Sequence, residues 1–279
     1  MDLPPLRVGT VPYLVGRPLD FGLGAEPGIE LSQHVPAQLV ERLRDGRLDV
    51  ALVSSIELFR TPGTRFIDGP AVAGASEVAS VQLFLRRPIQ DVRTIALDPA
   101  SRAAATLVRV LCERPLSREG SGRPRVVPRF VEVEPGVDPR AVTADAWLRI
   151  GDAALRERLT EPDLPYYNPS REWAARTALP FVFACWIVRA GVELDPAHIE
   201  AFARARERGT EQREDLAREA AALWNLPLAA CRRYLLEECL YEPGPALRPA
   251  LLRFRDEAAA LGLCDGTLNP DRIELAHVT

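Results

Sequence analysis

The sequence predicts an α/β protein of two lobes with a helical C-terminal part, and three observations support this expectation. A strand followed by a polar turn and a helix recurs around residues 50–58, 94–112 and 147–155. Two extended segments, 81–87 and 181–189, enter and leave the block that holds the second and third repeats. The chain beyond that block is almost purely helical in pattern. Two crossings between blocks indicate a hinged molecule with its ligand between the lobes.

The composition excludes several classes of function. The 279 residues are 47% hydrophobic and carry a formal net charge of -4, which favours about two domains and argues against a nucleic-acid partner. All 35 basic residues are Arg, so a Walker A loop, a lysine Schiff base and a lysine general base are excluded. The three histidines are widely scattered, so we expect no bound metal.

Cysteine usage and the N-terminus indicate the compartment. The five cysteines form no CxxC pair, which fits a reduced intracellular protein. The first residues lack the pattern of a signal peptide, and no run approaches the ~20 apolar residues of a membrane span. We therefore expect a cytoplasmic protein without a membrane partner.

The first part of the chain alternates short strands with helices. Residues 6–10 form the first expected strand, and Pro36 begins an amphipathic helix at a position that favours proline. A second strand over 49–53 runs into Ser54-Ser55-Ile56-Glu57, whose Ser-x-x-Glu spacing predicts a capping box that occupies Glu57. Two further strands are expected over 66–74 and 79–86.

The inserted block is organised around the stretch 94–112. A buried strand over 94–97 is followed by the turn Asp98-Pro99 and by a helix that opens on Ser101. Backbone N–H groups, the Ser101 hydroxyl and the Arg102 guanidinium would then converge on a trap for a carboxylate or phosphate. A simpler interpretation is that Ser101 only caps its helix and Arg102 faces water. The threefold recurrence of the pattern favours the trap.

The remaining elements complete the expected lobes. Strands are predicted around 126–133 and 144–150, a helix after Gly151-Asp152, and a buried strand over the apolar run 180–188. The helical tail is expected to break at three places: Gly209, Pro227 and 243–245. Residues 1–88 with 186–279 would form the first lobe, and residues 89–185 the second.

Seven stretches resemble one known family in their order and spacing, although each is a weak signal alone. They are Val11-Pro12-Tyr13-Leu14 with Arg17-Pro18-Leu19, Val35-Pro36, Asp49 to Glu57, Ser80-Val81-x-Leu83, Leu97-Asp98-x-x-Ser101-Arg102, Ala144-Asp145-Ala146 with Ile150-Gly151-Asp152, and Glu172-Trp173 leading to Leu179 to Ala184 and Trp186. On these residues the chain is similar to the chorismate dehydratases of the futalosine route to menaquinone.

The resemblance implies a fold, a reaction and a substrate. The family has the type II periplasmic-binding-protein fold, which agrees with the two-lobed expectation. Its reaction removes water from chorismate and yields 3-[(1-carboxyvinyl)oxy]benzoate. Chorismate is a dicarboxylate, and each carboxylate at a helix N-terminus gains about 0.3 to 2 kcal/mol. Aromatisation drives the elimination and the family is thought to use the substrate's own enolpyruvyl group for proton transfer, so no cofactor is expected.

The candidate site residues lie mainly at strand-to-helix turns. Asp152 and Ser80 are the catalytic candidates. Asp152 would orient the leaving hydroxyl or transfer a proton, or else serve as an ordinary N-cap. The candidate substrate contacts are Tyr13, Ser54, Ser55, Ser80, Ser101, Arg102, Phe181 and Trp186. The aromatic members would otherwise be core residues, because aromatic stripes are more often buried than functional.

One departure from the family pattern bears on catalysis. The family usually reads Tyr-Leu-Asn-Ser or Tyr-Leu-Asn-Thr where this chain has Val15 and Gly16. Valine forms no side-chain hydrogen bond, and the loss of one preorganised donor costs about 10²-fold or more in rate. The pattern therefore also fits a relative that binds chorismate without turnover.

Two competing hypotheses assign the chain to different classes of protein. One is a solute-binding protein for a small anion, against which the missing signal segment argues. The second is the dihydroxynaphthoate-forming sister enzyme of the same pathway. Its N-terminal Ser-Pro-Cys-Pro-Asn-Asp pattern is absent, since this chain reads Val11-Pro12-Tyr13-Leu14 at that place.

Overall fold

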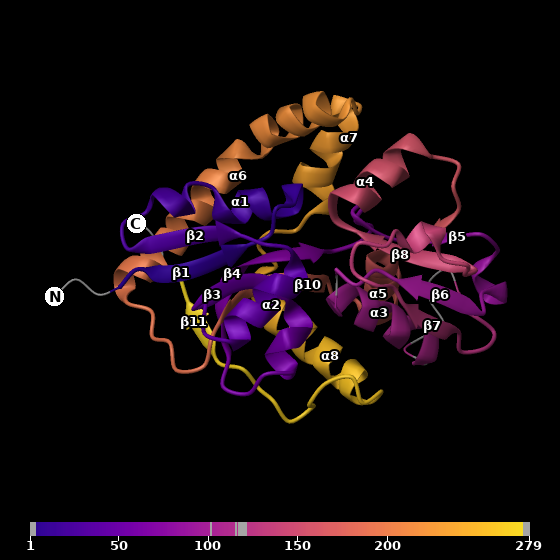
Figure 1. Cartoon of the computed structure of the whole chain (residues 1–279), viewed down its shortest axis with the longest axis horizontal. Coiled ribbons are helices and arrows are strands. Elements are labelled where there is room, and N and C mark those ends of the chain that lie inside the picture. Colours follow the sequence, from indigo (N-terminus) through magenta and orange to yellow (C-terminus); the bar gives the residue numbers. More distant parts are fainter. Residues whose placement is uncertain (1–3, 101, 115, 117–121, 276–279) are drawn as a thin grey trace.

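The computed structural model describes residues 4–100, 102–114, 116 and 122–275, and it contains two β-sheets with helices packed on both (Figure 1). Sheet A has six strands in the order β11-β4-β10-β3-β1-β2, and sheet B has five in the order β7-β6-β8-β5-β9. Each sheet forms the centre of one lobe, with sheet A on the left and sheet B on the right of Figure 1. The expected two-lobed α/β architecture is confirmed.

Sheet A combines strands from both ends of the chain. Its members are β1 (Leu6–Thr10), β2 (Ile29–Gln33), β3 (Val50–Ser54), β4 (Arg65–Gly74), β10 (Phe181–Val188) and β11 (Arg272–Glu274). The first three are mutually parallel, whereas β10 runs antiparallel between β3 and β4. Because β10 is covered on both faces and on both edges, its sequence is a continuous apolar run.

Sheet B is smaller and is made by the middle of the chain. Its members are β5 (Val81–Leu85), β6 (Thr94–Leu97), β7 (Arg129–Glu132), β8 (Ala146–Ile150) and β9 (Tyr166–Tyr167). Strand β6 lies parallel to β7 and β8, and β5 runs antiparallel to β8 and β9. The carboxyl ends of β6 and β8 therefore point to the same edge, where the turns into two helices begin.

The two sheets place the lobe boundaries differently from the boundaries expected at residues 88 and 186. Strand β5 belongs to sheet B, where Leu83 pairs with Leu148, and all of β10 belongs to sheet A, where Cys185 pairs with Val53. The chain therefore crosses between the sheets at 75–80 and again at 178–180. The apolar pattern of a buried strand is the same in either sheet, so it does not indicate which sheet receives the strand.

Eight α-helices lie among the described residues. They are α1 (Arg17–Asp20), α2 (Pro36–Arg44), α3 (Arg102–Glu113), α4 (Gly151–Thr160), α5 (Pro169–Thr177), α6 (Pro196–Trp224), α7 (Leu228–Arg233) and α8 (Leu247–Ala259). In Figure 1, α6 and α7 run along the upper side of the molecule, and α8 lies below sheet A. Over the described ranges, none of the helices combines the length and the apolar content that crossing a bilayer requires.

The long helix α6 corrects one expectation about the tail. The predicted break near Gly209 is wrong, because α6 runs without interruption past this residue. A Cβ atom at Gly209 would lie 1.7 Å from the carbonyl oxygen of Pro18, so glycine here permits α1 to cross α6 at close range. The expected break at Pro227 is confirmed, since α7 begins immediately after it.

Candidate functional site

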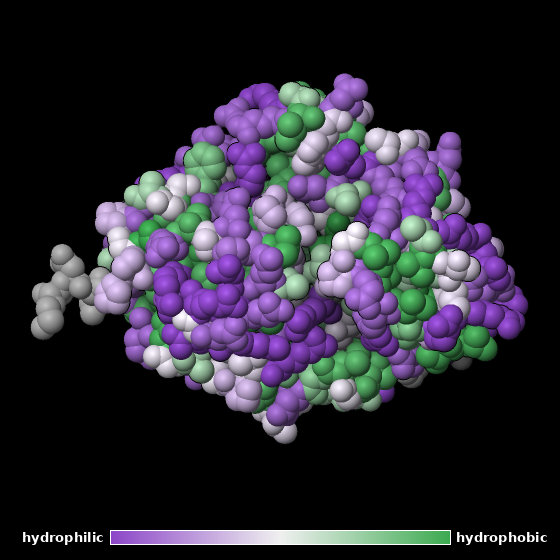
Figure 2. Space-filling model, viewed as in Figure 1, coloured by the Kyte–Doolittle hydropathy of each residue, from purple (hydrophilic) through white to green (hydrophobic). Residues whose placement is uncertain are grey.

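A cavity lies between the two lobes, at the carboxyl ends of strands from both sheets. Its wall is formed by residues 11–15 after β1, the end of β3, the middle of β10, the crossing segment 78–81, and the turns before α3 and α4. Figure 2 shows mainly hydrophilic residues on this side of the molecule, with hydrophobic ones beside the furrow between the lobes. Ligand crevices of open α/β sheets form at such strand ends.

The described conformation is closed over this cavity. Its volume is about 70 Å³, whereas pockets for small molecules typically measure about 300 to 1,000 Å³. Two hydrogen bonds join the lobes at its rim, from the Leu14 N–H to Asp152 Oδ1 at 3.0 Å and from the Ala103 N–H to Ser54 Oγ at 3.3 Å. A ligand of about ten carbon atoms enters only if the lobes separate.

Two of the predicted serines line the cavity. Ser80 lies on the crossing segment and is 4% exposed. Ser54 ends β3, and its hydroxyl accepts the Ala103 N–H in the first turn of α3. Ser54 therefore satisfies one of the unpaired N–H groups of a helix that belongs to the other lobe. A ligand carboxylate at this point would bind the same helix N-terminus.

Asp152 faces the other lobe rather than its own helix. The N-cap of α4 is Ile150, without a side-chain cap, and the Asp152 carboxylate instead accepts the Leu14 N–H. Burial raises the pKa of Asp152 from 3.8 to about 6, and the Leu14 N–H offsets only part of this effect. The carboxyl group therefore changes its protonation state near pH 6, and a group that takes part in proton transfer needs a pKa close to the operating pH.

The Tyr13 ring forms the cavity wall beside Asp152. It packs against Gly151, whose φ is +65°, and a Cβ atom there would lie 3.4 Å from the ring. Burial raises the pKa of Tyr13 to about 12, with the Asp98 and Asp152 carboxylates adding to the effect. Tyr13 therefore keeps its proton at neutral pH, and its hydroxyl is able to donate a hydrogen bond.

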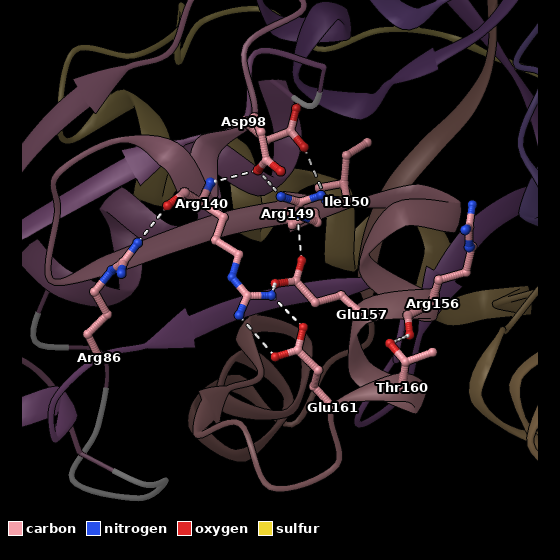
Figure 3. A network of polar contacts seen from close by, with 10 residues as sticks. Arg86, Asp98, Arg140, Arg149, Ile150, Arg156, Glu157, Thr160 and Glu161 are labelled. Atoms are coloured by element: carbon pink, nitrogen blue, oxygen red, sulfur yellow. Dashed lines mark hydrogen bonds and ion pairs between the residues drawn. The ribbon is translucent and has the colours of Figure 1, made fainter.

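Asp98 fixes the two helix-opening turns of sheet B relative to each other. One carboxylate oxygen accepts the Ala100 N–H at 2.9 Å and the other accepts the Ile150 N–H at 3.2 Å. Figure 3 shows the Asp98 carboxylate directed at the Ile150 backbone. Sequence reasoning assigned Asp98 to a turn only and missed this second contact, which joins residues 52 positions apart.

An ion-pair network joins the middle and the C-terminal end of α4 to neighbouring segments of the same lobe. Arg149 pairs with Glu157 at 2.7 Å and with Asp138, and Arg140 pairs with Glu157 at 3.2 Å and with Glu161 (Figure 3). These contacts tie Glu157, in the second turn of α4, and Glu161, at its C-cap, to β8 and to Arg140.

Ser55 and Arg102 do not reach the cavity, contrary to expectation. The Ser55 hydroxyl is fully buried and donates to the Val182 carbonyl oxygen at 2.6 Å. The Arg102 guanidinium lies 3.3 Å from a carboxylate oxygen of Glu57. Ser101, the other member of the predicted trap, lies outside the described residues.

Glu57 is an arginine-binding carboxylate rather than part of a capping box. It pairs with Arg44 at 2.6 Å and with Arg60 at 3.4 Å in addition to Arg102. The segment after β3 is a 3₁₀ helix (Ser55–Phe59) whose N-cap Ser54 makes no cap hydrogen bond within it. The capping-box prediction is therefore wrong, because three cations outcompete a backbone N–H for the carboxylate.

The two predicted aromatic contacts belong to the core. Phe181 packs edge-on against Phe254 at 4.7 Å between ring centroids, and Trp186 packs against Phe202 at 5.1 Å. Phe183 on the same strand reaches the cavity instead. The apolar run marks the whole strand as buried but does not indicate which residue borders a cavity.

The positions that depart from the family pattern lie at the cavity wall. Val15 lies in the 3₁₀ helix Leu14–Gly16, is 8% exposed and lines the wall. At Gly16 a Cβ atom would lie 2.8 Å from a methyl group of Val11. The point where the family places a polar side chain is therefore apolar in this chain.

The arrangement suits a small, partly apolar anion. The described wall contributes the hydroxyls of Tyr13, Ser54 and Ser80 and the N-terminal turns of α3 and α4 to an otherwise apolar surface. Across the described ranges, no three His, Cys, Asp or Glu side chains gather as metal ligands would. The wall therefore combines hydroxyl groups and two helix-opening turns with an apolar surface, and Asp152 directly follows the wall residue Gly151.

Comparison with known proteins points to one family and one fold. A family model described as menaquinone biosynthesis matches residues 6–260. A chorismate dehydratase from Thermus thermophilus is 29% identical over 287 residues, which cover 93% of this chain and 96% of that protein. The family model spans every described residue that borders the cavity, since these lie between Val11 and Ala184.

Solved structures share the architecture at low sequence identity. Protein AF1704 from Archaeoglobus fulgidus has a TM-score of 0.70 at 16% identity and covers 92% of this chain and 97% of its own. The alkanesulfonate-binding protein SsuA from Xanthomonas axonopodis has a TM-score of 0.66 at 17% identity, with 98% and 99% covered. The CA3427 gene product of Candida albicans, described as having the generic periplasmic-binding-protein fold, has a TM-score of 0.62 at 13% identity, with 94% and 91% covered. The fold is therefore that of the periplasmic binding proteins.

Proposed function

Because this chain belongs to the menaquinone-biosynthesis family, we propose that it is a chorismate dehydratase. It would act as a carbon–oxygen hydro-lyase that converts chorismate to 3-[(1-carboxyvinyl)oxy]benzoate and water. The observation that carries this proposal is the interlobe cavity, in which Ser80 and Tyr13 border an apolar space and the titratable Asp152 directly follows the wall residue Gly151. The similarity to the Thermus thermophilus chorismate dehydratase supports the choice of substrate.

Substrate binding would rest on two helix N-termini and an apolar wall. The opening turns of α3 and α4 border the cavity at Ala100, Ile150 and Gly151, and each carboxylate placed at a helix N-terminus would gain about 0.3 to 2 kcal/mol. Ser54 already accepts one of these N–H groups and would share it with a carboxylate oxygen. Phe183 and Val15 would contact the ring.

The elimination requires one proton to leave carbon and another to reach the departing oxygen. When the ring C–H bond and the C–O bond break, the electron pair of the C–H bond completes the aromatic ring, and the hydroxide takes up a proton and leaves as water. Ser80 would donate a hydrogen bond to the departing oxygen, and Asp152 would exchange a proton near neutral pH. Aromatisation supplies the driving force, so orientation and charge placement are the main tasks of the protein.

The lobes would open and close during each turnover. The closed cavity is smaller than the substrate, and the Leu14–Asp152 and Ser54–Ala103 contacts seal it. We place the hinge at the two crossings, 75–80 and 178–180.

We also place the protein in the cytoplasm, where the reducing conditions suit its five free cysteines.

The experiment that tests the proposal is incubation of purified protein with chorismate and mass spectrometry of the product. A product lighter than chorismate by one water, with an aromatic ultraviolet spectrum, supports the dehydratase. Ser80→Ala is the test variant for the site. It removes one hydroxyl from the cavity wall and is therefore expected to slow product formation.

A second candidate function rests on Val15. Because this apolar residue stands at the cavity wall, the protein would bind chorismate or a similar aromatic carboxylate without turning it over. Chorismate that binds in calorimetry and is recovered intact favours this function over the dehydratase. Chorismate that does not bind at all contradicts both.

A further inference from the structure

Tyr234 comes from the C-terminal helical part and lies close to Ser80, one of the two catalytic candidates. Its side chain is 1% exposed, and among the described residues its buried hydroxyl makes no hydrogen bond of regular geometry, although the Ser80 hydroxyl and the Cys239 thiol lie near it. This hydroxyl is close enough to Ser80 for the two side chains to interact, and it feels the charge of Asp152. A buried hydroxyl without a partner is costly, so it marks a group whose partner arrives with a change in the site.

The local backbone explains how Tyr234 comes to face Ser80. Residues Tyr234–Glu238 form a single π-helical turn after α7, a feature that occurs frequently at functional sites. The carboxylate at the end of this turn, Glu238, accepts the Ala79 N–H at 2.8 Å. The turn therefore holds the residue next to Ser80 at one end and presents the Tyr234 hydroxyl to Ser80 at the other.

We infer that Tyr234 is a positioning residue for Ser80. In the ligand-bound site the Tyr234 O–H donates to Ser80 Oγ, and the Ser80 proton is then directed at the ligand. This inference rests on the proposed dehydratase function, since it assigns Ser80 the task of donating a hydrogen bond to the departing oxygen.

The direction of donation follows from the surroundings of the phenol. Burial, together with the nearby Cys239, Tyr241 and Asp152, raises the pKa of Tyr234 well above its ordinary value. The phenol therefore keeps its proton throughout the working pH range and serves as a donor. A serine hydroxyl that accepts this proton has its own proton free for the substrate.

The chain supplies a matched control in Tyr241. This residue is also buried, and its hydroxyl likewise finds no hydrogen-bond partner in the part of the chain that the structure describes. Burial and the nearby Cys239 raise its pKa and Arg213 lowers it, and Ser80 is not among the groups that affect it. Removing its hydroxyl therefore repeats the chemical change without touching the site.

The test is a kinetic double-mutant cycle with chorismate as substrate. Tyr234→Phe is expected to lower kcat about tenfold, as loss of one neutral hydrogen bond does, with KM and the urea midpoint nearly unchanged. Tyr241→Phe is expected to match the wild type. In a Ser80→Ala background, Tyr234→Phe is expected to change kcat by less than about twofold, because the residue it orients is gone.

Several outcomes overturn the inference. Wild-type kcat in Tyr234→Phe overturns it, and so does the same tenfold loss in the Ser80→Ala background, which would show that Tyr234 acts independently. Should Tyr234→Phe fail to fold, Glu238→Ala tests the same geometry, because it releases Ala79; it is expected to lower kcat in the wild type and not in Ser80→Ala. A wild-type protein that leaves chorismate intact overturns the proposed function itself.

Discussion

Replacement of Asp152 by asparagine tests whether burial destabilises the ionised form of this carboxyl group as much as its surroundings indicate. Burial raises its pKa from 3.8 to about 6, so the folded protein holds the proton more tightly than the unfolded chain does. Wild-type stability from this group is therefore full below pH 4, falls as the pH rises toward 6, and stays lower above that. At about 1.4 kcal/mol per pKa unit, the rise from 3.8 to about 6 corresponds to about 3 kcal/mol.

This value is an upper bound on the stability that ionisation of Asp152 removes, because part of the Asp152 side chain reaches solvent. Asparagine keeps an oxygen that accepts the Leu14 N–H and does not titrate. The measurement is urea unfolding of both proteins at pH 4, 5, 6 and 7.5. The stability of Asp152→Asn relative to wild type is expected to increase by about 1 to 3 kcal/mol between the lowest and highest pH.

A stability difference that does not change with pH would refute this reasoning. Asp20→Asn is the matched control, because burial also raises the pKa of Asp20 to about 6 and this residue does not border the cavity. Both substitutions are expected to show the same trend in stability. The pH dependence of chorismate turnover is expected to change in Asp152→Asn alone.

Three further predictions follow from the closed cavity and its wall. Arg102→Ala is expected to change the chorismate Kd by less than about threefold in calorimetry, since the guanidinium is paired with Glu57. A tenfold weaker affinity would show that Arg102 binds the substrate anion, as the sequence predicted. Val15→Asn is expected to raise kcat by about tenfold or more, because it supplies a hydrogen-bond donor at the cavity wall. Val15→Leu is the control, since it adds no donor. Equal kcat values in the two variants would show that the donor is unnecessary. Chorismate is expected to bring the radius of gyration in small-angle scattering toward the value of about 19 Å typical of a compact chain of this length, and identical profiles with and without it would contradict hinge closure.

The sequence predicted the elements whose pattern is local. The stretch 94–112 was expected as strand, turn and helix, and it forms β6 and α3. The strands β2, β9 and β11 were missed because they are short or polar edge strands, whose residues adopt an extended form only through pairing with a neighbour. The helix α5 was missed because its nine residues carry a weak apolar periodicity, and packing against β10 and α3 stabilises it instead.

The sequence located the turns of the site but not the directions of their side chains. Ser54 and Ser55 are neighbours at the end of β3, yet one borders the cavity and the other donates into the core. Phe181 and Phe183 differ in the same way. Arg102 turns to Glu57, a partner 45 positions away, and such long-range partners leave no signal in local spacing. The turns could therefore be predicted, whereas the contacts that decide each role required the fold.

The charge balance of the site suggests how Asp152 would obtain the proton that the departing hydroxyl needs. Glu57 holds Arg44, Arg60 and Arg102, and no arginine borders the cavity in the described part of its wall. A bound dianion would therefore raise the pKa of Asp152 beyond about 6, because a nearby like charge disfavours the ionised carboxyl group. Chorismate binding at about pH 7 is then accompanied by uptake of a proton.

Calorimetry in buffers of different ionisation enthalpy measures this uptake directly. We expect a fraction of a proton per chorismate for the wild type at pH 7, and a smaller fraction at pH 5, where much of Asp152 is already protonated. Asp152→Asn is expected to bind chorismate with little or no proton uptake, while Asp20→Asn behaves as the wild type. Equal uptake in the wild type and Asp152→Asn would place the proton on another group and remove Asp152 from the elimination.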